Sequence, residues 1–170
     1  MEYVKTDYQN ISVNPAALFA REQAILSAGK AGDCNSMLIG WGSVGTLWGK
    51  PVVTVYVRPE RYTMKYLLEY DTFSVAFYDA GNRQIAPFGA RSGRDCDKYA
   101  LTGLRPLFCD GTPYTDGAKL VLICCKRSVQ DMEPSIFTDP ALNDRWYGKE
   151  GYHNVIVGEI TACLTPEAIE

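Results

Sequence analysis

The feature that most restricts the fold of this chain is a glycine-rich connection between two apolar runs within residues 34–63. Three glycines in the connection have the G-x-G-x-x-G spacing of a dinucleotide-binding loop: Gly40, Gly42 and Gly45. That spacing is meaningful only where a helix follows at once, because the helix N-terminus holds the pyrophosphate. Here Gly49 and Pro51 would end a helix after about one turn. We therefore reject a doubly wound fold and predict two strands joined by a glycine-rich hairpin connection.

Strand-like runs dominate the rest of the chain. Runs of β-branched, aromatic and other apolar residues predict five strands: Met37–Trp41, Val52–Val57, Phe73–Phe77, Leu120–Val129 and Val155–Leu164. Short helices are expected between some of these strands, but strands and helices do not alternate regularly. The sequence therefore predicts a mainly β fold, an antiparallel split β-barrel with short peripheral helices, as one domain over residues 1–170.

The remaining segments are predicted to be short helices and loops. Asn14 and Pro15 begin a helical turn through Phe19, and Thr63 is expected to cap a helix over residues 64–70. A further helix is expected at residues 96–102, ending at Gly103. Three segments are less regular: 1–13 as an edge segment, 24–28 as either helix or strand, and 131–147 as a long polar loop.

Charge and cysteine content limit the possible partners. The net charge of −3 argues against broad electrostatic attraction to nucleic acid or to an anionic membrane. No apolar run approaches the roughly 20 residues that span a bilayer, and the first residues lack a signal-peptide pattern, so we expect a cytoplasmic protein. The six cysteines form no C-x-x-C pair and there is one histidine. Free thiols are thus favoured over disulfides, and no metal site is predicted.

Two groups of basic residues lie at predicted helix starts. The first comprises Arg58, Arg61 and Thr63, and the second comprises Ser92, Gly93, Arg94, Asp95 and Lys98. Guanidinium groups bind phosphate oxygens through paired hydrogen bonds, and free N–H groups at a helix start favour an anion. Two such loops in an acidic domain suggest one shared anionic ligand. The alternative is two solvated loops whose charges pair with nearby carboxylates: Glu60, Asp95 and Asp97.

Aromatic residues gather around the same stretch of sequence: Trp41, Trp48, Tyr56 and Tyr62. They are compatible with stacking on a planar ligand and with ordinary core packing. The only histidine, His153, precedes the last strand and is compatible with ligand binding, proton transfer or a plain structural place. No Ser/His/Asp set, carboxylate pair or metal-ligand spacing is present, so neither hydrolytic nor metal chemistry is supported.

Together these motifs resemble the flavin reductase-like, FMN-binding split-barrel family, and within it the flavoredoxin-like branch. The matching stretches follow the family order through most of the chain: Asn35–Met37, Gly40–Gly42, Leu47–Pro51, Arg58–Thr63, Asn82–Lys98, Tyr152–His153 and Gly158–Ile160. One departure is Gly151, because members often have an acidic residue just before the Tyr-His pair.

The resemblance implies a homodimer that holds FMN near the dimer interface. Asn35, Ser36 and Met37 would follow the isoalloxazine edge, and Trp41 would lie near the ring. The phosphate side would be bound by both basic loops: Arg58, Arg61, Tyr62, Thr63, Ser92, Arg94 and Lys98. His153 would be the candidate catalytic residue, facing the second substrate together with Trp146 and Tyr147.

The implied function is an FMN-binding oxidoreductase that moves electrons between NAD(P)H or a redox protein and an acceptor. FMN would carry the electrons and the protein would supply position and electrostatics. The alternative is a non-catalytic flavin carrier or sensor with the same fold, and a weaker one is a purely structural interaction domain. The sequence identifies neither donor nor acceptor, nor whether FMN is a bound cofactor or a substrate.

Overall fold

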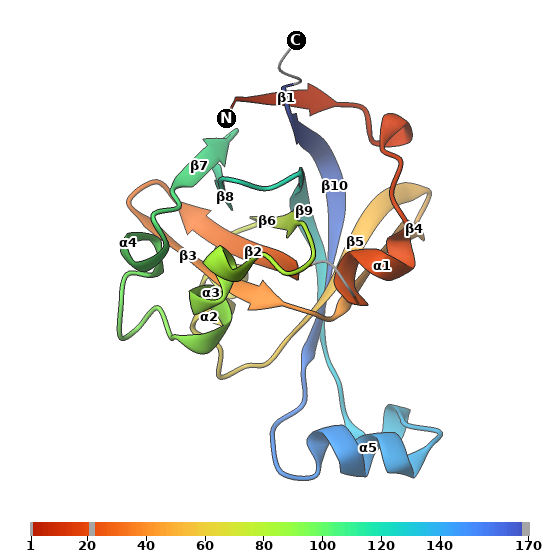
Figure 1. The fold of residues 1–170 in the computed structure, drawn as a ribbon. Helices are drawn as coiled ribbons and strands as arrows, with labels where there is room; N and C mark the ends of the chain where they lie inside the picture. Colours follow the sequence, from red (N-terminus) through yellow and green to blue (C-terminus); the bar gives the residue numbers. More distant parts are fainter. Residues whose placement is uncertain (1, 21–22, 168–170) are drawn as a thin grey trace.

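The computed structural model describes residues 2–20 and 23–167 (Figure 1). The main sheet contains eight strands: β1 Tyr3–Thr6, β2 Gln23–Lys30, β3 Asp33–Ile39, β4 Gly42–Leu47, β5 Lys50–Val57, β6 Thr72–Tyr78, β9 Leu120–Asp131 and β10 Asn154–Pro166. Their spatial order is β3-β2-β6-β9-β10-β5-β4, with β1 also paired to β10. A second sheet consists of β7 Pro106–Cys109 and β8 Thr112–Thr115. All pairings are antiparallel, which confirms the predicted fold class.

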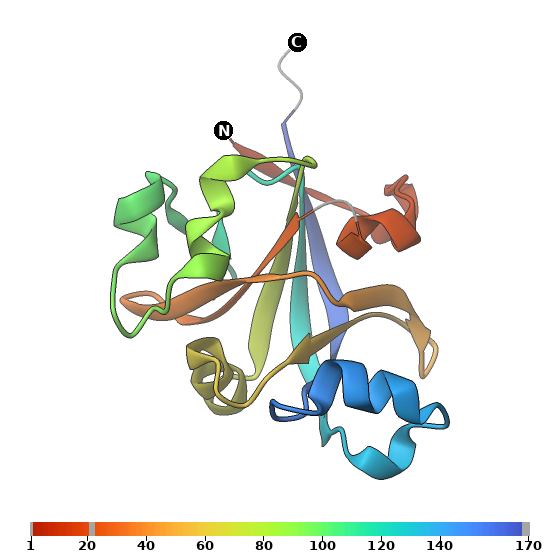
Figure 2. The same cartoon turned by 60° about the horizontal axis from the view of Figure 1, so that its bottom comes forward.

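Short helices surround the sheets: η1 Tyr8–Asn10, α1 Pro15–Ala20, α2 Tyr62–Glu69, η2 Arg83–Ile85, α3 Pro87–Ala90, α4 Lys98–Thr102, η3 Pro134–Ile136 and α5 Pro140–Tyr147. The first predicted helix is confirmed, because the side chain of Asn14 accepts hydrogen bonds from the backbone of Ala16 and Ala17. Helix α5 and the neighbouring η3 lie beyond the ends of β9 and β10, apart from the remaining helices (Figure 1), and they come to the front in the turned view of Figure 2. Within the described ranges, no helix has the length and apolar character needed to cross a membrane.

The central strands are buried on both faces. In β6, Phe73, Val75 and Phe77 join the larger apolar cluster, while Ala76 and Tyr78 join the smaller one. Side chains of a strand alternate between faces, so a strand with a core on each side is apolar throughout. Strand β9 behaves in this way only over its first half, since its exposure rises from residue 125 onwards.

The predicted hairpin is only partly right. Strand β5 does belong to a hairpin, but its partner is β4 inside the glycine-rich segment, whereas the predicted partner strand at Met37–Trp41 contributes residues 37–39 to β3, which pairs with β2. Strand β4 begins at Gly42 and pairs with β5, and the turn is formed by Trp48 and Gly49, whose φ angles are +53° and +69°. Two consecutive positive φ values are typical of a tight hairpin turn. A Cβ on Gly42 would lie 2.5 Å from the ring of Phe19. The absence of a side chain at Gly42 therefore leaves the space that the Phe19 ring of α1 occupies.

Two predicted helix starts and one predicted loop are wrong. Helix α2 begins at Tyr62 with Arg61 as its N-cap, so Thr63 lies inside the helix and does not cap it. Helix α4 begins at Lys98, because the carboxylate of Asp97 accepts hydrogen bonds from the backbone of the first turn. Residues 131–147 are not a loop but contain η3 and α5. There, an Asp-Pro pair at 139–140 supplies the N-cap and the first helical residue.

The sequence did not identify strand β2 or the hairpin of β7 and β8. Residues 24–28, left open between helix and strand, belong to β2 between β3 and β6. The hairpin of β7 and β8 was missed, although its turn, Asp110–Gly111, is a strong hairpin signal. The expected edge segment at residues 1–13 is confirmed in part by β1, which pairs along β10.

Candidate functional site

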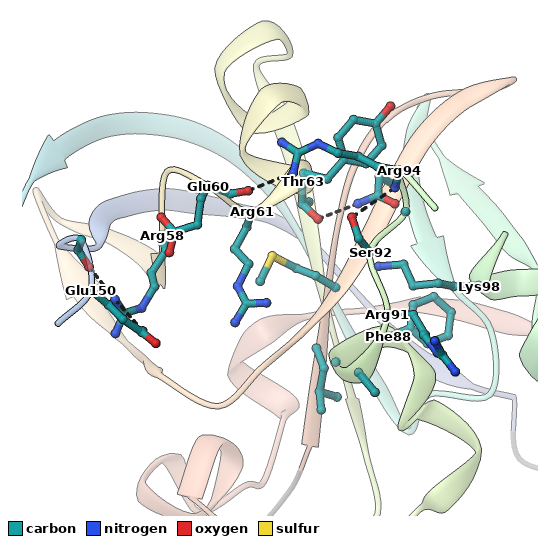
Figure 3. A pocket seen from close by; sticks show the side chains of 18 residues that line it. Arg58, Glu60, Arg61, Thr63, Phe88, Arg91, Ser92, Arg94, Lys98 and Glu150 are labelled. Atoms are coloured by element: carbon teal, nitrogen blue, oxygen red, sulfur yellow. Dashed lines mark hydrogen bonds and ion pairs between the residues drawn. The ribbon is translucent and has the colours of Figure 1, made fainter. Parts of the chain in front are cut away.

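A positively charged pocket of about 520 Å³ opens beside β3 (Figure 3). Its walls come from β3, the loop from β5 into α2, helix α3, the loop into α4, and the segment before β10. Five cationic side chains line it: Arg58, Arg61, Arg91, Arg94 and Lys98. Only two carboxylates, those of Glu60 and Glu150, share the walls. We call this cavity the cationic pocket, and its excess positive charge contrasts with the net charge of −3 of the whole chain.

The two basic loops predicted to share a ligand are in direct contact. Arg94 donates a hydrogen bond of 3.3 Å from Nη1 to the backbone carbonyl of Glu60. Its guanidinium carbon also lies 5.2 Å from the centre of the Tyr62 ring. Within the second basic loop, the backbone N–H of Arg94 donates a hydrogen bond to the hydroxyl of Ser92, which restricts the loop. The structure thus brings both loops to one cavity, in place of two separate solvated corners.

Asn35 joins the strand to both loops. The residue is 7% exposed, and its Nδ2 donates a 2.7 Å hydrogen bond to the hydroxyl of Thr63 in α2. The amide oxygen of Asn35 lies against Gly93, where a Cβ would come within 2.1 Å of it. Asn35 is therefore a buried polar connection between β3, α2 and the second loop, and the backbone must approach it closely at Gly93.

Lys98 carries a buried charge at the wall of the cationic pocket. It is only 5% exposed, its Nζ donates a hydrogen bond to the carbonyl of Ser36, and it lies 5.7 Å from the centre of the Phe88 ring. Burial lowers the pKa of Lys98, and the nearby cation of Arg61 lowers it further. An ammonium group has three N–H donors, and the described hydrogen bond to Ser36 uses one of them. The remaining donors can therefore bind an anion.

The two arginines of the first loop have different surroundings. Arg58 donates to the carbonyls of Gly151 and Trp146 over 2.6 and 3.2 Å and pairs with Glu150 over 3.0 Å. Its guanidinium therefore fastens the segment after α5 to the barrel. The side chain of Arg61 has no hydrogen-bond or ion-pair partner among the residues that the structure describes, and Figure 3 shows it extending into the cavity. Arg61 is thus the cation of this loop that remains open to a ligand.

Five of the predicted site residues lie outside the cationic pocket. The side chain of Ser36 is buried beneath it, where its hydroxyl bonds to Ser27 over 2.7 Å and to Tyr99 over 2.6 Å. Only the backbone of Ser36 faces Lys98. The other four are grouped in and around a neighbouring pocket: Trp41, Trp146, Tyr147 and His153.

His153 is held by aromatic residues. Its Nδ1 is 2.9 Å from the hydroxyl of Tyr147, and its ring centre is 4.8 Å from that of Trp41. Burial lowers the pKa of His153, and the Arg58 cation contributes in the same direction. The neutral imidazole is therefore favoured at neutral pH, where it is suited to hydrogen bonding.

Sequence reasoning missed several residues of the cationic pocket. Arg91 lies in an irregular segment with no signal beyond its charge. Phe88 and Gly89 belong to α3, and Gly89 packs against Leu38. A Cβ on Gly89 would lie 3.0 Å from the side chain of Leu38. Glu150 follows α5 and meets the pocket only through tertiary structure. No cluster of metal-binding side chains occurs among the described residues.

The model of the flavin reductase like domain matches residues 16–170. No curated protein matched the sequence.

Several solved structures share the fold. A flavoredoxin from Methanosarcina acetivorans is 24% identical with a TM-score of 0.66, and the match covers 98% of this chain and 77% of that one. An FMN-binding protein from Thermus thermophilus with bound p-hydroxybenzaldehyde is 20% identical with a TM-score of 0.64, covering 84% and 70%. An NADH:FAD oxidoreductase from Streptomyces globisporus, in complex with NAD and FAD fragments, is 18% identical with a TM-score of 0.64, covering 88% and 78%.

The family match and the fold agree with each other. The matched residues include every strand from β2 to β10 and both loops of the cationic pocket. The solved structures show the same mainly β split-barrel architecture at low sequence identity. This chain belongs to the family of flavin reductase-like domains.

Proposed function

We propose that this protein is an FMN-binding oxidoreductase that moves electrons between NAD(P)H, or a redox protein, and an acceptor. The observation that carries the proposal is the contact between two basic loops around one cavity in an acidic chain. A phosphate needs convergent donors, and such an arrangement supplies them. Membership of the flavin reductase-like family supports a flavin as the ligand.

The residues of the cationic pocket fit FMN. Its volume of about 520 Å³ lies in the range of small-molecule sites. The guanidinium groups of Arg61 and Arg94 and the hydroxyl of Ser92 would hold the phosphate, with Lys98 adding a buried charge. The apolar side chains of Met37 and Leu38 supply walls suited to a planar ring. FMN is preferred to FAD here because the basic residues match a terminal phosphate.

The chain itself would position the ligand and set the electric field around it. When bound, FMN supplies two-electron redox chemistry that amino-acid side chains lack. Arg61 and Lys98 provide a positive potential, which favours the negative charge that a flavin gains on reduction. The neutral His153 beside Trp41 would orient a second substrate through hydrogen bonding, with no requirement for an acid or base.

Equilibrium binding of FMN tests this proposal. The purified protein should bind FMN with 1:1 stoichiometry and more tightly than FAD. Arg61→Ala should weaken FMN binding about 10-fold or more, because a hydrogen bond to a charged group contributes about 1.5–3 kcal/mol. Arg83→Ala is the matched control, since Arg83 is exposed in η2 and outside the cationic pocket. Failure to bind either flavin would overturn the proposal.

Anaerobic mixing separates the oxidoreductase from the carrier or sensor. Loss of the visible flavin absorbance with NADH or NADPH supports the oxidoreductase. If neither nicotinamide reduces the bound FMN, a redox protein would be required as donor, or the carrier would be favoured. The absence of a catalytic acid–base set does not decide between them, because the electrons reside on the flavin.

A homodimer also forms part of the proposal. Support comes from large apolar side chains that are exposed at the tip of the β4–β5 hairpin and on α5, including Trp48 at 62% and Leu142 at 49%. Apolar side chains gathered at exposed positions commonly mark interaction surfaces. Light scattering at several protein concentrations measures the oligomeric state, and a monomer throughout would contradict this part of the proposal.

A further inference from the structure

Four hydroxyl groups form a closed ring of hydrogen bonds behind strand β3. They come from four different elements: Ser27 of β2, Ser36 of β3, Tyr99 of α4 and Thr115 of β8. The hydroxyl oxygen of Ser36 lies 2.7 Å from that of Ser27 and 2.6 Å from that of Tyr99. The hydroxyl oxygen of Thr115 closes the ring, 3.1 Å from that of Tyr99 and 3.4 Å from that of Ser27. We call this arrangement the hydroxyl ring.

The hydroxyl ring satisfies polar groups that would otherwise be costly in the interior. Ser27, Ser36 and Thr115 are each no more than 1% exposed. The hydroxyl of Ser36 donates to that of Ser27, and the same direction continued around the ring gives every member one donated and one accepted hydrogen bond. Burial raises the pKa of Tyr99, so its hydroxyl keeps the proton that it donates. Removing one member would leave buried neighbours with fewer partners, which costs free energy in an apolar interior.

The hydroxyl ring is connected to the cationic pocket through two adjacent residues of α4. Lys98 and Tyr99 both bond to Ser36: the Lys98 ammonium donates to its backbone carbonyl, and the Tyr99 hydroxyl bonds to its side chain. The Phe88 ring lies beside both residues, with its centre 5.7 Å from the Lys98 nitrogen and 5.3 Å from the centre of the Tyr99 ring. Helix α4 has only five residues and is too short to be stable alone, so these contacts decide where its first turn lies.

The position of Lys98 matters because a lysine side chain is long and flexible. A ligand that must order such a side chain loses affinity, whereas an ammonium that is already held in place avoids this cost. Lys98 is 5% exposed, and Figure 3 shows its side chain directed into the cavity. Its ammonium is therefore ordered at the wall of the cationic pocket before any ligand binds.

We propose that Tyr99 is a positioning residue: through the hydroxyl ring it fixes the first turn of α4 on β3 and so holds the Lys98 ammonium where it binds the ligand of the cationic pocket. This inference rests on the proposed function, because the ligand that Lys98 would bind is FMN. A simpler role for the hydroxyl ring is to stabilise the fold by pairing buried hydroxyls. That role predicts a loss of stability on removing a hydroxyl, with no effect on Lys98 or on FMN.

Tyr99→Phe tests the inference, because it removes one hydroxyl and keeps the aromatic ring that packs against Phe88. Two quantities are measured: the affinity for FMN by fluorescence titration, and the rate at which trace acetic anhydride acetylates Lys98 in the protein without FMN, followed over a series of pH values by mass spectrometry. FMN should bind about 5-fold more weakly or worse, the loss expected for one hydrogen bond. Lys98 should react faster, and its apparent pKa should rise toward the ordinary 10.5 as the amine becomes better solvated.

Tyr78→Phe is the matched control. Tyr78 is 1% exposed, and its hydroxyl donates to the carbonyls of Thr115 and Asp116, both over 3.0 Å, outside the hydroxyl ring. Tyr78→Phe should lower the stability to urea at least as much as Tyr99→Phe, yet keep the wild-type acetylation profile and an FMN affinity within about twofold of the wild type. Ser36→Ala, alone or combined with Tyr99→Phe, should weaken FMN binding by the same factor as Tyr99→Phe, because each variant removes the same bond.

The outcomes distinguish this inference from the proposed function. Where the wild type binds FMN, the inference requires that Tyr99→Phe change both the FMN affinity and the acetylation of Lys98, and a change in only one of them, or in neither, overturns it. Equal changes in Tyr78→Phe would also overturn it, since a general loss of stability would then explain both. If the wild type binds no FMN, the proposed function fails, and the acetylation profile alone shows whether Tyr99 holds Lys98 in place.

Discussion

A Cβ atom on Gly93 would lie 2.1 Å from Oδ1 of Asn35, so these two residues fix how closely the second basic loop approaches β3. Gly93→Ala must displace the Asn35 amide and strain its 2.7 Å bond to Thr63. We expect a loss of about 1–3 kcal/mol in the free energy of unfolding, the usual range for overpacking. Urea unfolding measures this loss.

The comparison variant for Gly93→Ala is Gly45→Ala. No atom lies within 4 Å of a Cβ at Gly45, and its φ is not in the left-handed region. Shortening Asn35 to Ala should reduce the cost of Gly93→Ala, since the clash would be removed; the two changes should therefore be non-additive. Equal losses in both backgrounds would show that Asn35 is not the residue that makes alanine costly at 93.

Lys98→Met should separate binding from stability. Burial lowers the pKa of Lys98 in the folded state, so the folded protein holds this proton less tightly than the unfolded chain does. Its charge therefore costs stability below the unfolded pKa near 10.5, and this cost diminishes as the pH rises through the window between the folded and unfolded values. Removing the charge should not reduce the free energy of unfolding at pH 7 by more than about 1 kcal/mol.

The same variant should lose affinity for FMN. The proposed site uses the buried ammonium of Lys98 as a donor to the ligand, so Lys98→Met should weaken FMN binding about 10-fold or more. Fluorescence titration of FMN and urea unfolding on one preparation give both quantities. A variant that unfolds like the wild type and binds FMN equally well would exclude Lys98 from the site.

Much of the fold follows from local sequence patterns. Strands β5, β6, β9 and β10 were predicted because β-branched and aromatic runs dominate them. The start of α2 was misplaced because Thr63 finds a buried partner in Asn35, 28 positions away, and so has no need to cap. Such long-range hydrogen bonds cannot be seen in a local pattern. By contrast, α5 was missed even though its Asp-Pro start was visible in the sequence.

The candidate site was predictable as residue types but not as an arrangement. Charge and spacing identified both basic loops, and their contact through Arg94 and Glu60 agrees with the shared cavity that was expected. Spacing could not show that Arg58 is already bonded to residues 144–151, the end of α5 and the turn after it, which we call the arm, because its partners lie 88 to 93 positions away. Nor could it show that Ser36 points beneath the pocket, since strand alternation leaves the choice of face open.

Arg58 and Arg61 are expected to differ when each is replaced by alanine. Arg58→Ala removes the bonds to the carbonyls of Trp146 and Gly151 and should loosen the arm. Limited trypsin digestion should then cut faster after Arg145 and Lys149, while Arg61→Ala keeps the wild-type rate because Arg61 makes no described bond to the arm. Mass spectrometry of the fragments identifies the cut sites. Equal cutting in both variants would contradict the fastening role of Arg58.

His153 offers a direct measurement of the field beside the arm, because it is the only histidine in the chain. Burial and the Arg58 cation lower its pKa below the ordinary value of 6.5. The unfolded chain therefore takes up the proton first as the pH falls. Stability attributable to this group is complete above pH 6.5 and declines through the window between 6.5 and the lower folded value.

Proton NMR of the single imidazole should give a titration midpoint below 6.5 in the wild type. Arg58→Gln removes one of the two main causes of the shift, so the midpoint should rise toward 6.5. Arg83→Gln deletes an exposed cation that is not among the charges acting on His153, and it should leave the midpoint unchanged. A wild-type midpoint at or above 6.5 would mean that His153 is solvated or paired with a carboxylate. It would then be protonated in a substantial fraction of molecules near neutral pH, and its role as a purely neutral hydrogen-bonding partner would have to be abandoned.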